Sequence, residues 1–275
     1  MTKTVKKLSI IIVFLLINLF LYPNIINAEN YSNSNSNLEY TLNGYDINII
    51  VNENNTLNIT EKISAYFNAE KHGIFRKIPL KNKITRLDGT ISKNRAKISE
   101  IKVSDSYSVS TNSEYKIIKI GDANYTLTGQ NNYEISYLYN LGRDTGKEYD
   151  ELYFNLIGDE WDTSISNITF TITMPKNFDS SKLGFSSGYI GSTDSSKITY
   201  NVDGNVISGK YNGTLNSGEA LTVRLELPEG YFVNTGNNIF SPYYLMFIVP
   251  IIGLVISFIF WKKYGKDEQV IETVE

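Results

Sequence analysis

Apolar and polar residues alternate along several stretches of the chain, as they do in strands that bury one face. One such stretch runs from Tyr45 to Val51, the turn-rich segment Asn52 to Thr56 follows, and the alternation resumes from Leu57 to Phe67. This arrangement predicts a β-hairpin. The same period of two returns later in the chain at Tyr133 to Tyr139, Ile168 to Ile172, and Leu221 to Leu227.

The segments between these stretches favour one fold class. Clusters such as Asp203-Gly204-Asn205 and Asn212-Gly213 offer turn residues between short strands, and helical spacing is weak by comparison. We therefore expect a mainly β protein, with an antiparallel β-sandwich over residues 39–234. The Asn- and Ser-rich residues 29–38 are expected to form a flexible leader.

The segment from Lys81 to Lys97 interrupts the alternation and is strongly basic, although Asp88 reduces its charge. It predicts a long surface excursion. Two interpretations stay open at this stage. The segment is either a solvated loop or a patch for an anionic wall polymer or lipid headgroups.

An apolar run near the N-terminus indicates export. Lys3, Lys6 and Lys7 precede the run from Leu8 to Leu21, and the small-residue ending at Ala28 suits a signal peptidase. We predict a signal peptide over residues 1–28, with an uncleaved signal anchor as the alternative. Either arrangement places the following domain outside the cell.

A second apolar segment, residues 243–261, carries no charge and would span about 28 Å as a helix, close to the thickness of the hydrocarbon core. We predict a transmembrane helix there. Lys262, Lys263 and Lys266 follow it, so residues 262–275 are expected to form a cytoplasmic tail. The expected location is the plasma membrane, with a single pass, an extracellular N-terminal domain and the lipid bilayer as a partner.

Composition narrows the range of activities. The net charge of -3 and the pI near 5.4 give no electrostatic case for a nucleic-acid partner, whose phosphate backbone needs a clustered basic face. The chain has no cysteine and one histidine, which leaves no thiolate or multi-histidine metal site, and no serine-nucleophile motif accompanies that histidine. We expect no catalytic residues, no metal and no cofactor.

One arginine stands out among apolar neighbours. Arg76, if buried, needs a carboxylate partner to offset its desolvation. Glu61 shares its parity along the strand with Leu57, Ile59 and Ile63, which places its side chain on the inward face. We predict that Arg76 and Glu61 pair, either as an ion bridge that specifies the fold or as half of a ligand site.

Two further residues complete the candidate site for a ligand or partner. His72 precedes Gly73, which predicts a turn with unusual backbone dihedrals. Trp161 lies in the acidic stretch Gly158 to Asp162. The carboxylates of this stretch suit calcium or a glycosidase-like acid pair, and the aromatic ring beside them suits sugar stacking. A loop with a structural Trp161 is the plainer interpretation.

Several stretches over nearly the whole mature chain share a pattern with one family. They are Tyr45 to Val51, Leu57 to Phe67 with Glu61 inside it, His72 to Pro79, Leu152 to Gly158 leading to Trp161, Met174-Pro175, Leu227 to Phe232, and Gly265-Lys266-Asp267. In these the chain resembles bacterial predicted membrane proteins with the domain of unknown function 2207 (DUF2207). The resemblance implies an exported β-sandwich tethered by one helix, and it brings no established catalytic residues. Family members usually continue beyond the first helix, so a shortened or split form is expected.

The expected function is a membrane-tethered extracytoplasmic binding or scaffolding module of unknown biochemical activity. Its expected partner is another envelope protein or a cell-wall polymer. One alternative is a sensor subunit that signals through a membrane partner. The other is a carboxylate-based cell-wall glycan hydrolase that uses Asp159, Glu160 or Asp162.

Overall fold

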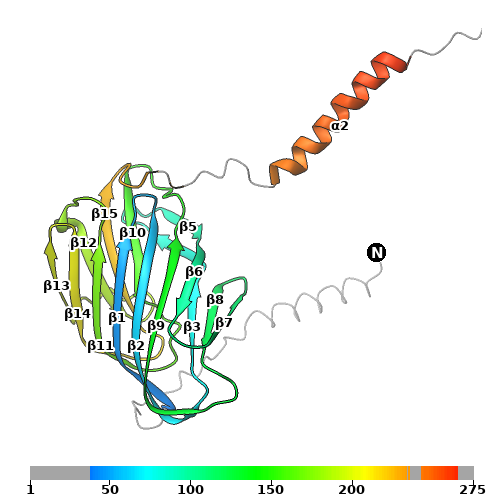
Figure 1. Cartoon of the computed structure of the whole chain (residues 1–275). Helices are drawn as coiled ribbons and strands as arrows, with labels where there is room; N and C mark the ends of the chain where they lie inside the picture. Colours follow the sequence, from blue (N-terminus) through cyan, green and yellow to red (C-terminus); the bar gives the residue numbers. More distant parts are fainter. Residues whose placement is uncertain (1–37, 234, 236–242, 266–275) are drawn as a thin grey trace, which may run out of the picture. The chain divides into compact units, whose positions relative to one another are not determined.

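The computed structural model describes residues 38–233, 235 and 243–265. The expected signal peptide, all but the last residue of the leader, and the tail from residue 266 onward lie outside these residues. Within the described part, strands form four sheets, and one long helix, α2 (Tyr243–Tyr264), follows them in the sequence (Figure 1).

The largest sheet has seven strands in the order β13-β14-β11-β1-β2-β9-β6. Its strands are β1 (Tyr40–Val51), β2 (Thr56–Lys71), β6 (Lys97–Val103), β9 (Leu127–Asn140), β11 (Ile165–Thr173), β13 (Ile198–Asp203) and β14 (Val206–Leu215). The expected β1–β2 hairpin is confirmed, and Asn55 adopts a positive φ of 57° in its turn. Asparagine tolerates that conformation better than most residues.

Two three-stranded sheets pack against one face of this sheet. One comprises β10 (Tyr149–Ile157), β15 (Ala220–Pro228) and β12 (Leu183–Gly188), which follows the short 3-10 helix η2 (Ser180–Lys182), and the other comprises β3 (Ile74–Pro79), β8 (Tyr115–Ile120) and β7 (Tyr107–Thr111). Their inward side chains join those of the large sheet in one core; Ile63 of β2, Ile118 of β8 and Val223 of β15 are all buried. The fold is mainly β with two layers, as expected.

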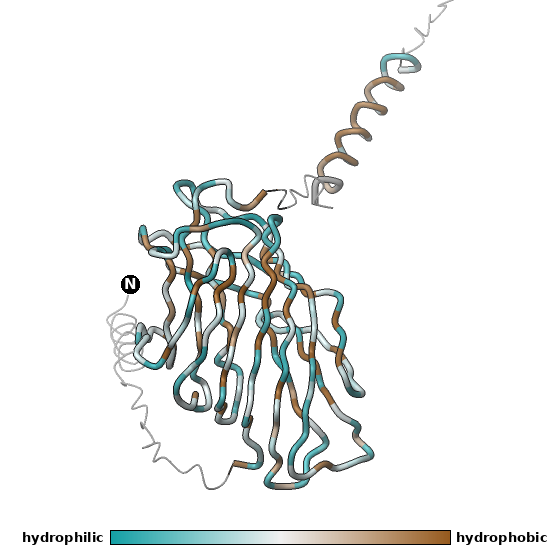
Figure 2. Tube along the Cα trace, turned by 60° about the vertical axis from the view of Figure 1, so that its left-hand side comes forward, coloured by the Kyte–Doolittle hydropathy of each residue, from teal (hydrophilic) through white to brown (hydrophobic). Residues whose placement is uncertain are grey.

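The alternation seen in the sequence becomes the inside and outside of the sandwich. Along β2, Leu57 and every second residue as far as Phe67 are buried, while the residues between them are exposed or half-buried. Figure 2 shows this alternation along the strands. Burying one such aliphatic side chain contributes about 1.5–3 kcal/mol, which makes a register slip of one residue costly.

One strand pair departs from the antiparallel arrangement. β1 and β11 run parallel, with Tyr45 beside Ile168, whereas the other strand pairs of the described residues are antiparallel. Parallel neighbours need a long connection between them, and here that connection contains β2 to β10. Periodicity cannot reveal such a pair, because it shows which face is buried and not which strand lies alongside.

The basic segment Lys81 to Lys97 is more ordered than expected. It forms an antiparallel hairpin of β4 (Lys81–Thr85) and β5 (Ile91–Arg95), followed by the first residue of β6. One face of this hairpin is exposed and the other only half-buried. The segment is thus a surface excursion that is built as a paired hairpin instead of a solvated loop. The sequence did not reveal the two strands because a hairpin that buries little needs no apolar alternation.

The Asn212-Gly213 pair was expected to separate strands but lies inside β14. The pairing of β14 with β11 shifts register between Ser166 and Ile168, and Asn167 has a positive φ of 50° at this irregularity. A β-bulge therefore uses the residues that suggested a turn.

Helix α2 is long and apolar enough to cross a membrane over Met246–Tyr264. Its 22 residues extend past the expected end at Trp261 and include Lys262 and Lys263 in the last turn. Pro250 lies inside the helix, which lipid-embedded helices tolerate.

Candidate ligand-binding pocket

Two glycines position the start of β3. A Cβ atom on Gly73 would lie 1.8 Å from the carbonyl oxygen of Ile120, and one on Gly121 would lie 1.9 Å from that of His72. Both glycines have positive φ, of 131° and 122°. The expected turn at His72 and Gly73 is confirmed, and its tight crossing with the end of β8 admits no side chain at either glycine.

Arg76 and Glu61 form the predicted pair across the two layers. Arg76 of β3 donates from Nη2 to Glu61 Oε1 and from Nε to Glu61 Oε2, each at 2.8 Å. Tyr137 of β9 donates its hydroxyl to Glu61 Oε1 at 2.7 Å. The two charged residues are only 3% and 0% exposed, so the interaction is a bidentate ion pair inside the core.

This network controls the protonation of Glu61. Burial alone raises the pKa of a carboxyl group, but the Arg76 charge and the hydrogen bonds from Arg76 and Tyr137 hold the pKa of Glu61 below its ordinary value. Glu61 therefore stays ionised in the core. Its negative charge in turn stabilises the Arg76 guanidinium.

Trp161 covers the same cluster from the loop between β10 and β11. Its ring centroid lies 5.7 Å from Arg76 Cζ and 6.0 Å from the Tyr45 ring, which meets it edge-on. Trp161 is 4% exposed. The interpretation of Trp161 as a structural residue in a loop is confirmed, and any contact with a ligand must pass through its neighbours.

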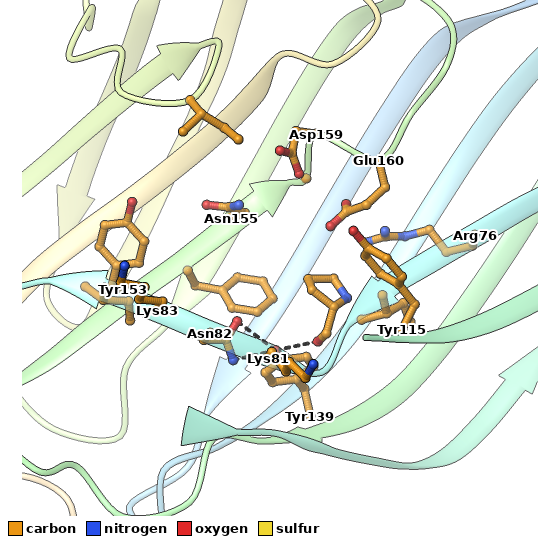
Figure 3. A pocket seen from close by; sticks show the side chains of 16 residues that line it. Arg76, Lys81, Asn82, Lys83, Tyr115, Tyr139, Tyr153, Asn155, Asp159 and Glu160 are labelled. Carbon is orange, nitrogen blue, oxygen red and sulfur yellow. Dashed lines mark hydrogen bonds between the residues drawn. The ribbon is translucent and has the colours of Figure 1, made fainter. Parts of the chain in front are cut away.

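A cavity of about 340 Å³ opens beside Arg76, and we call it the Arg76 pocket (Figure 3). Residues from β3, β4, β8, β9 and β10, the loop after β10 and the loop after β12 line it. They are Arg76, Ile78, Pro79, Lys81, Asn82, Lys83, Ile84, Tyr115, Tyr139, Tyr153, Phe154, Asn155, Gly158, Asp159, Glu160 and Ile190. Both sheets of the second layer therefore contribute to its walls.

Hydrogen bonds hold several of the lining side chains in place. Tyr139 donates to the carbonyl of Pro79 at 2.9 Å, and Asn82 donates to the Tyr139 hydroxyl at 3.0 Å. Asn155 accepts from Thr222 at 2.9 Å. Burial raises the pKa of Tyr139 to about 12, so it remains a neutral hydroxyl at physiological pH.

Glu160 is the carboxyl group of the pocket lining that has a buried oxygen without a hydrogen-bond partner within the described residues. Its Oε2 is buried and makes no hydrogen bond within the described residues. Burial raises the pKa of Glu160, although the Arg76 charge opposes this effect. The carboxyl group folds back over Gly158, where an added Cβ atom would lie 2.1 Å from Oε2.

The structure brings together three of the four candidate residues. Glu61, Arg76 and Trp161 form one cluster, whereas His72 lines a different cavity of about 380 Å³ and its Nδ1 lies 2.9 Å from the Tyr125 carbonyl oxygen. Arg76 alone among the four lines the Arg76 pocket.

Several pocket residues were not anticipated from the sequence. They are Asn82, Tyr115, Tyr139, Tyr153 and Asn155. No motif marks them, because four strands from distant parts of the chain bring them together. In the part of the chain that the structure describes, no three His, Asp or Glu side chains gather into a group that could hold a metal ion.

A family model described as predicted membrane protein (DUF2207) N-terminal domain matches residues 41–227. This range covers more than half of the chain. The chain belongs to the DUF2207 family. Its C-terminal helix and this membership together make it a membrane protein.

Two of the stretches that resemble DUF2207 contribute residues to the Arg76 pocket. The segment His72 to Pro79 supplies the glycine turn and the whole of β3. The segment Leu152 to Gly158 belongs to β10 and the loop after it. The segment His72 to Pro79, which is the most specific part of the resemblance, and the segment Leu152 to Gly158 thus both contribute to the lining of one cavity.

Solved structures show only a distant likeness to the DUF2207 domain. Leukotriene A4 hydrolase from Saccharomyces cerevisiae shares 10% identity at a TM-score of 0.39, over 68% of this chain and 29% of that one. The M1 zinc metallopeptidase from Deinococcus radiodurans shares 8% identity at a TM-score of 0.37, over 67% and 42%. The chain thus spans less than half of either protein, and so low a score supports no argument about function. A search of the curated proteins returned no match.

Proposed function

We propose that this DUF2207 protein is a membrane-tethered, extracytoplasmic binding module whose Arg76 pocket holds a sugar unit of an envelope glycan. The chemistry of the pocket lining supports this proposal. Two amides, Asn82 and Asn155, and two carboxyl groups, Asp159 and Glu160, face a cavity with three tyrosines. Sugar hydroxyls both donate and accept hydrogen bonds, which suits amides and carboxylates, and the C–H faces of a sugar pack on aromatic rings.

The rigidity of the pocket floor also favours binding. The Glu61–Arg76 pair and its bond from Tyr137 fix the side chains under the cavity before any ligand arrives. A preformed site loses less conformational entropy on binding than one that must be ordered.

The orientation of the chain forms part of the proposal. The expected signal peptide at residues 1–28 would export the sandwich, and Lys262 and Lys263 at the end of α2 favour a cytoplasmic C-terminus. The pocket would then lie outside the cell, in a domain that α2 tethers to the membrane.

The test measures binding by the full-length protein in nanodiscs of neutral lipid, with a tetramer of β-1,4-linked N-acetylglucosamine as the probe. Titration calorimetry should detect binding by the wild type. Replacing Asp159 by alanine removes a charge-assisted hydrogen bond and should weaken binding by about tenfold or more. The matched variant Asp203→Ala, in the exposed β13–β14 turn, should bind like the wild type.

Two results would contradict the proposal. Absence of binding to this probe and to a wider panel of wall oligosaccharides would remove the sugar site. Release of shorter oligosaccharides that is lost in Glu160→Gln would replace the binding module by a hydrolase, since that chemistry needs a carboxylic acid.

A further inference from the structure

The β4–β5 hairpin places four cationic side chains on one exposed face. Lys81 lies directly opposite Arg95, and Lys83 directly opposite Lys93. All four are exposed, while the residues between them turn their side chains toward the body of the protein. We call these four residues the cation ladder.

The ladder receives little compensation from nearby carboxylates. Lys81 has Glu114 at 3.9 Å, with both side chains more than half exposed. Within the described residues, Lys83, Lys93 and Arg95 form no ion pair. Directly opposed like charges in an antiparallel pair destabilise it, so the hairpin carries this arrangement at the expense of its own stability.

The hairpin is held firmly on its other face and at its turn. Arg86 donates to both oxygens of Asp144, at 2.9 and 3.1 Å, and the Asn82 amide donates to Tyr139. Arg224 of β15 donates to the carbonyl of Thr85. These contacts fix the hairpin to β9 of the seven-stranded sheet, to the loop after β9 and to β15, so the ladder is a built surface.

The ladder adjoins the Arg76 pocket. Lys81 and Lys83 line the pocket and form one side of the ladder, and Lys93 and Arg95 form the other side. Figure 3 shows Lys81 and Lys83 at the edge of the cavity, together with Asn82. A linear ligand with one unit in the pocket would therefore have these cations beside it.

We propose that the ligand of this module is an anionic glycan, with one sugar unit in the Arg76 pocket and its phosphate or carboxylate groups on the cation ladder. The inference rests on the proposed function, and it specifies in addition that the bound glycan is negatively charged. An anionic membrane surface would also attract the ladder, but it would leave the amides and carboxyl groups of the adjoining pocket unused. The continuity of pocket and ladder favours a single polymer that occupies both.

The experiment compares four probes on the full-length protein in neutral nanodiscs. They are the neutral N-acetylglucosamine tetramer, a short polymer of N-acetylglucosamine 1-phosphate, inorganic polyphosphate, and vesicles that contain phosphatidylglycerol. The test variant is Lys93→Gln with Arg95→Gln, because these two residues belong to the ladder and do not line the pocket. The matched control is Lys62→Gln with Lys210→Gln, two exposed lysines of the seven-stranded sheet.

The wild type should bind the phosphate-linked polymer about tenfold more tightly than the neutral tetramer at low ionic strength, because the ladder adds electrostatic attraction. High salt and the ladder variant should each abolish this advantage. Binding of the neutral tetramer should be the same in the wild type, the ladder variant and the control.

Three results would overturn the inference. If the neutral and phosphate-linked probes bind equally, the ladder plays no part, although the sugar site stands. If polyphosphate binds as tightly as the phosphate-linked polymer, the ladder recognises charge without sugar. If ladder-dependent binding to the vesicles exceeds that to the polymer, the partner is a membrane surface. Loss of all sugar binding would instead remove the proposed function itself.

Discussion

Two groups of charges, within one small region of the fold, show opposite arrangements. The Glu61–Arg76 pair is buried, bidentate and completed by a hydroxyl donor from Tyr137. The cation ladder is exposed, and its like charges face one another across a hairpin. Charges that serve the fold are neutralised at contact distance. In the ladder, Lys83, Lys93 and Arg95 form no ion pair within the described residues, and this lack of compensation supports the proposal of an anionic ligand.

The largest expected effect comes from breaking the buried pair. Replacing Arg76 by alanine leaves the Glu61 carboxylate buried without its cation, and the free energy of unfolding should fall by about 3–5 kcal/mol. Urea unfolding in detergent, followed by Trp161 fluorescence in a Trp261→Phe background, measures this change. Arg95→Ala, an exposed arginine of the ladder, should change stability by less than about 0.5 kcal/mol. Equal losses of unfolding free energy in Arg76→Ala and Arg95→Ala would contradict the contrast between the buried pair and the ladder.

Removing both partners should cost less than removing one. The double variant Glu61→Leu with Arg76→Met replaces the ion pair by apolar side chains, and it leaves the Tyr137 hydroxyl without its acceptor and the Lys77 carbonyl without the donor from Arg76. We expect a remaining loss of about 1–3 kcal/mol, measured in the same unfolding assay. A double variant that is less stable than Arg76→Ala would show that the pair is essential for more than charge neutralisation.

Acid should weaken the buried pair. Because the folded-state pKa of Glu61 lies below its ordinary value of 4.5, the stabilisation is present above that value and is lost as the pH falls toward the folded-state pKa. The stability difference between the wild type and Glu61→Gln should therefore shrink as the pH drops below 4.5. Thermal unfolding of both proteins over this range is the measurement, and a constant difference would exclude a depressed pKa.

The smallest expected effect concerns the ladder and has the opposite sign. Lys93→Glu turns the opposed Lys83–Lys93 pair into an attractive one and should raise stability by about 0.2–1 kcal/mol. The same change should abolish the preference for anionic glycans. Denaturant midpoints and glycan titrations on one preparation test both statements. A loss of stability would show that the lysines do not repel each other in the folded protein.

The sequence predicts the structure correctly where the local alternation of apolar and polar residues determines which face of a strand is buried. The inward faces of β2 and β9 follow directly from the parity of Leu57, Ile63 and Tyr137, and the parity of Glu61 led to its pairing with Arg76. The pattern fails where burial is slight, as in β4 and β5, which have one half-buried face and no apolar alternation.

The Arg76 pocket could not be predicted because its residues share no local signal. Asn82, Tyr115 and Asn155 come from strands of three different sheets, which meet only in the folded protein. The turn-like Asn212-Gly213 pair misled for a related reason, since a bulge against β11 uses the same residue types as a turn.

The parallel pairing of β1 and β11 has a consequence for how the chain folds as it is made. β1 can pair with β2 as soon as both strands have been synthesised. The partner on its other edge is β11, where Thr169 pairs with Asp46 from 123 positions further along the chain. Until β11 has been synthesised, the middle of the future sheet is an open edge, and open edges invite pairing with other chains. The slow, aggregation-prone phase of folding therefore ends only when β11 emerges, long after the pocket walls at β3 and β8 have been synthesised.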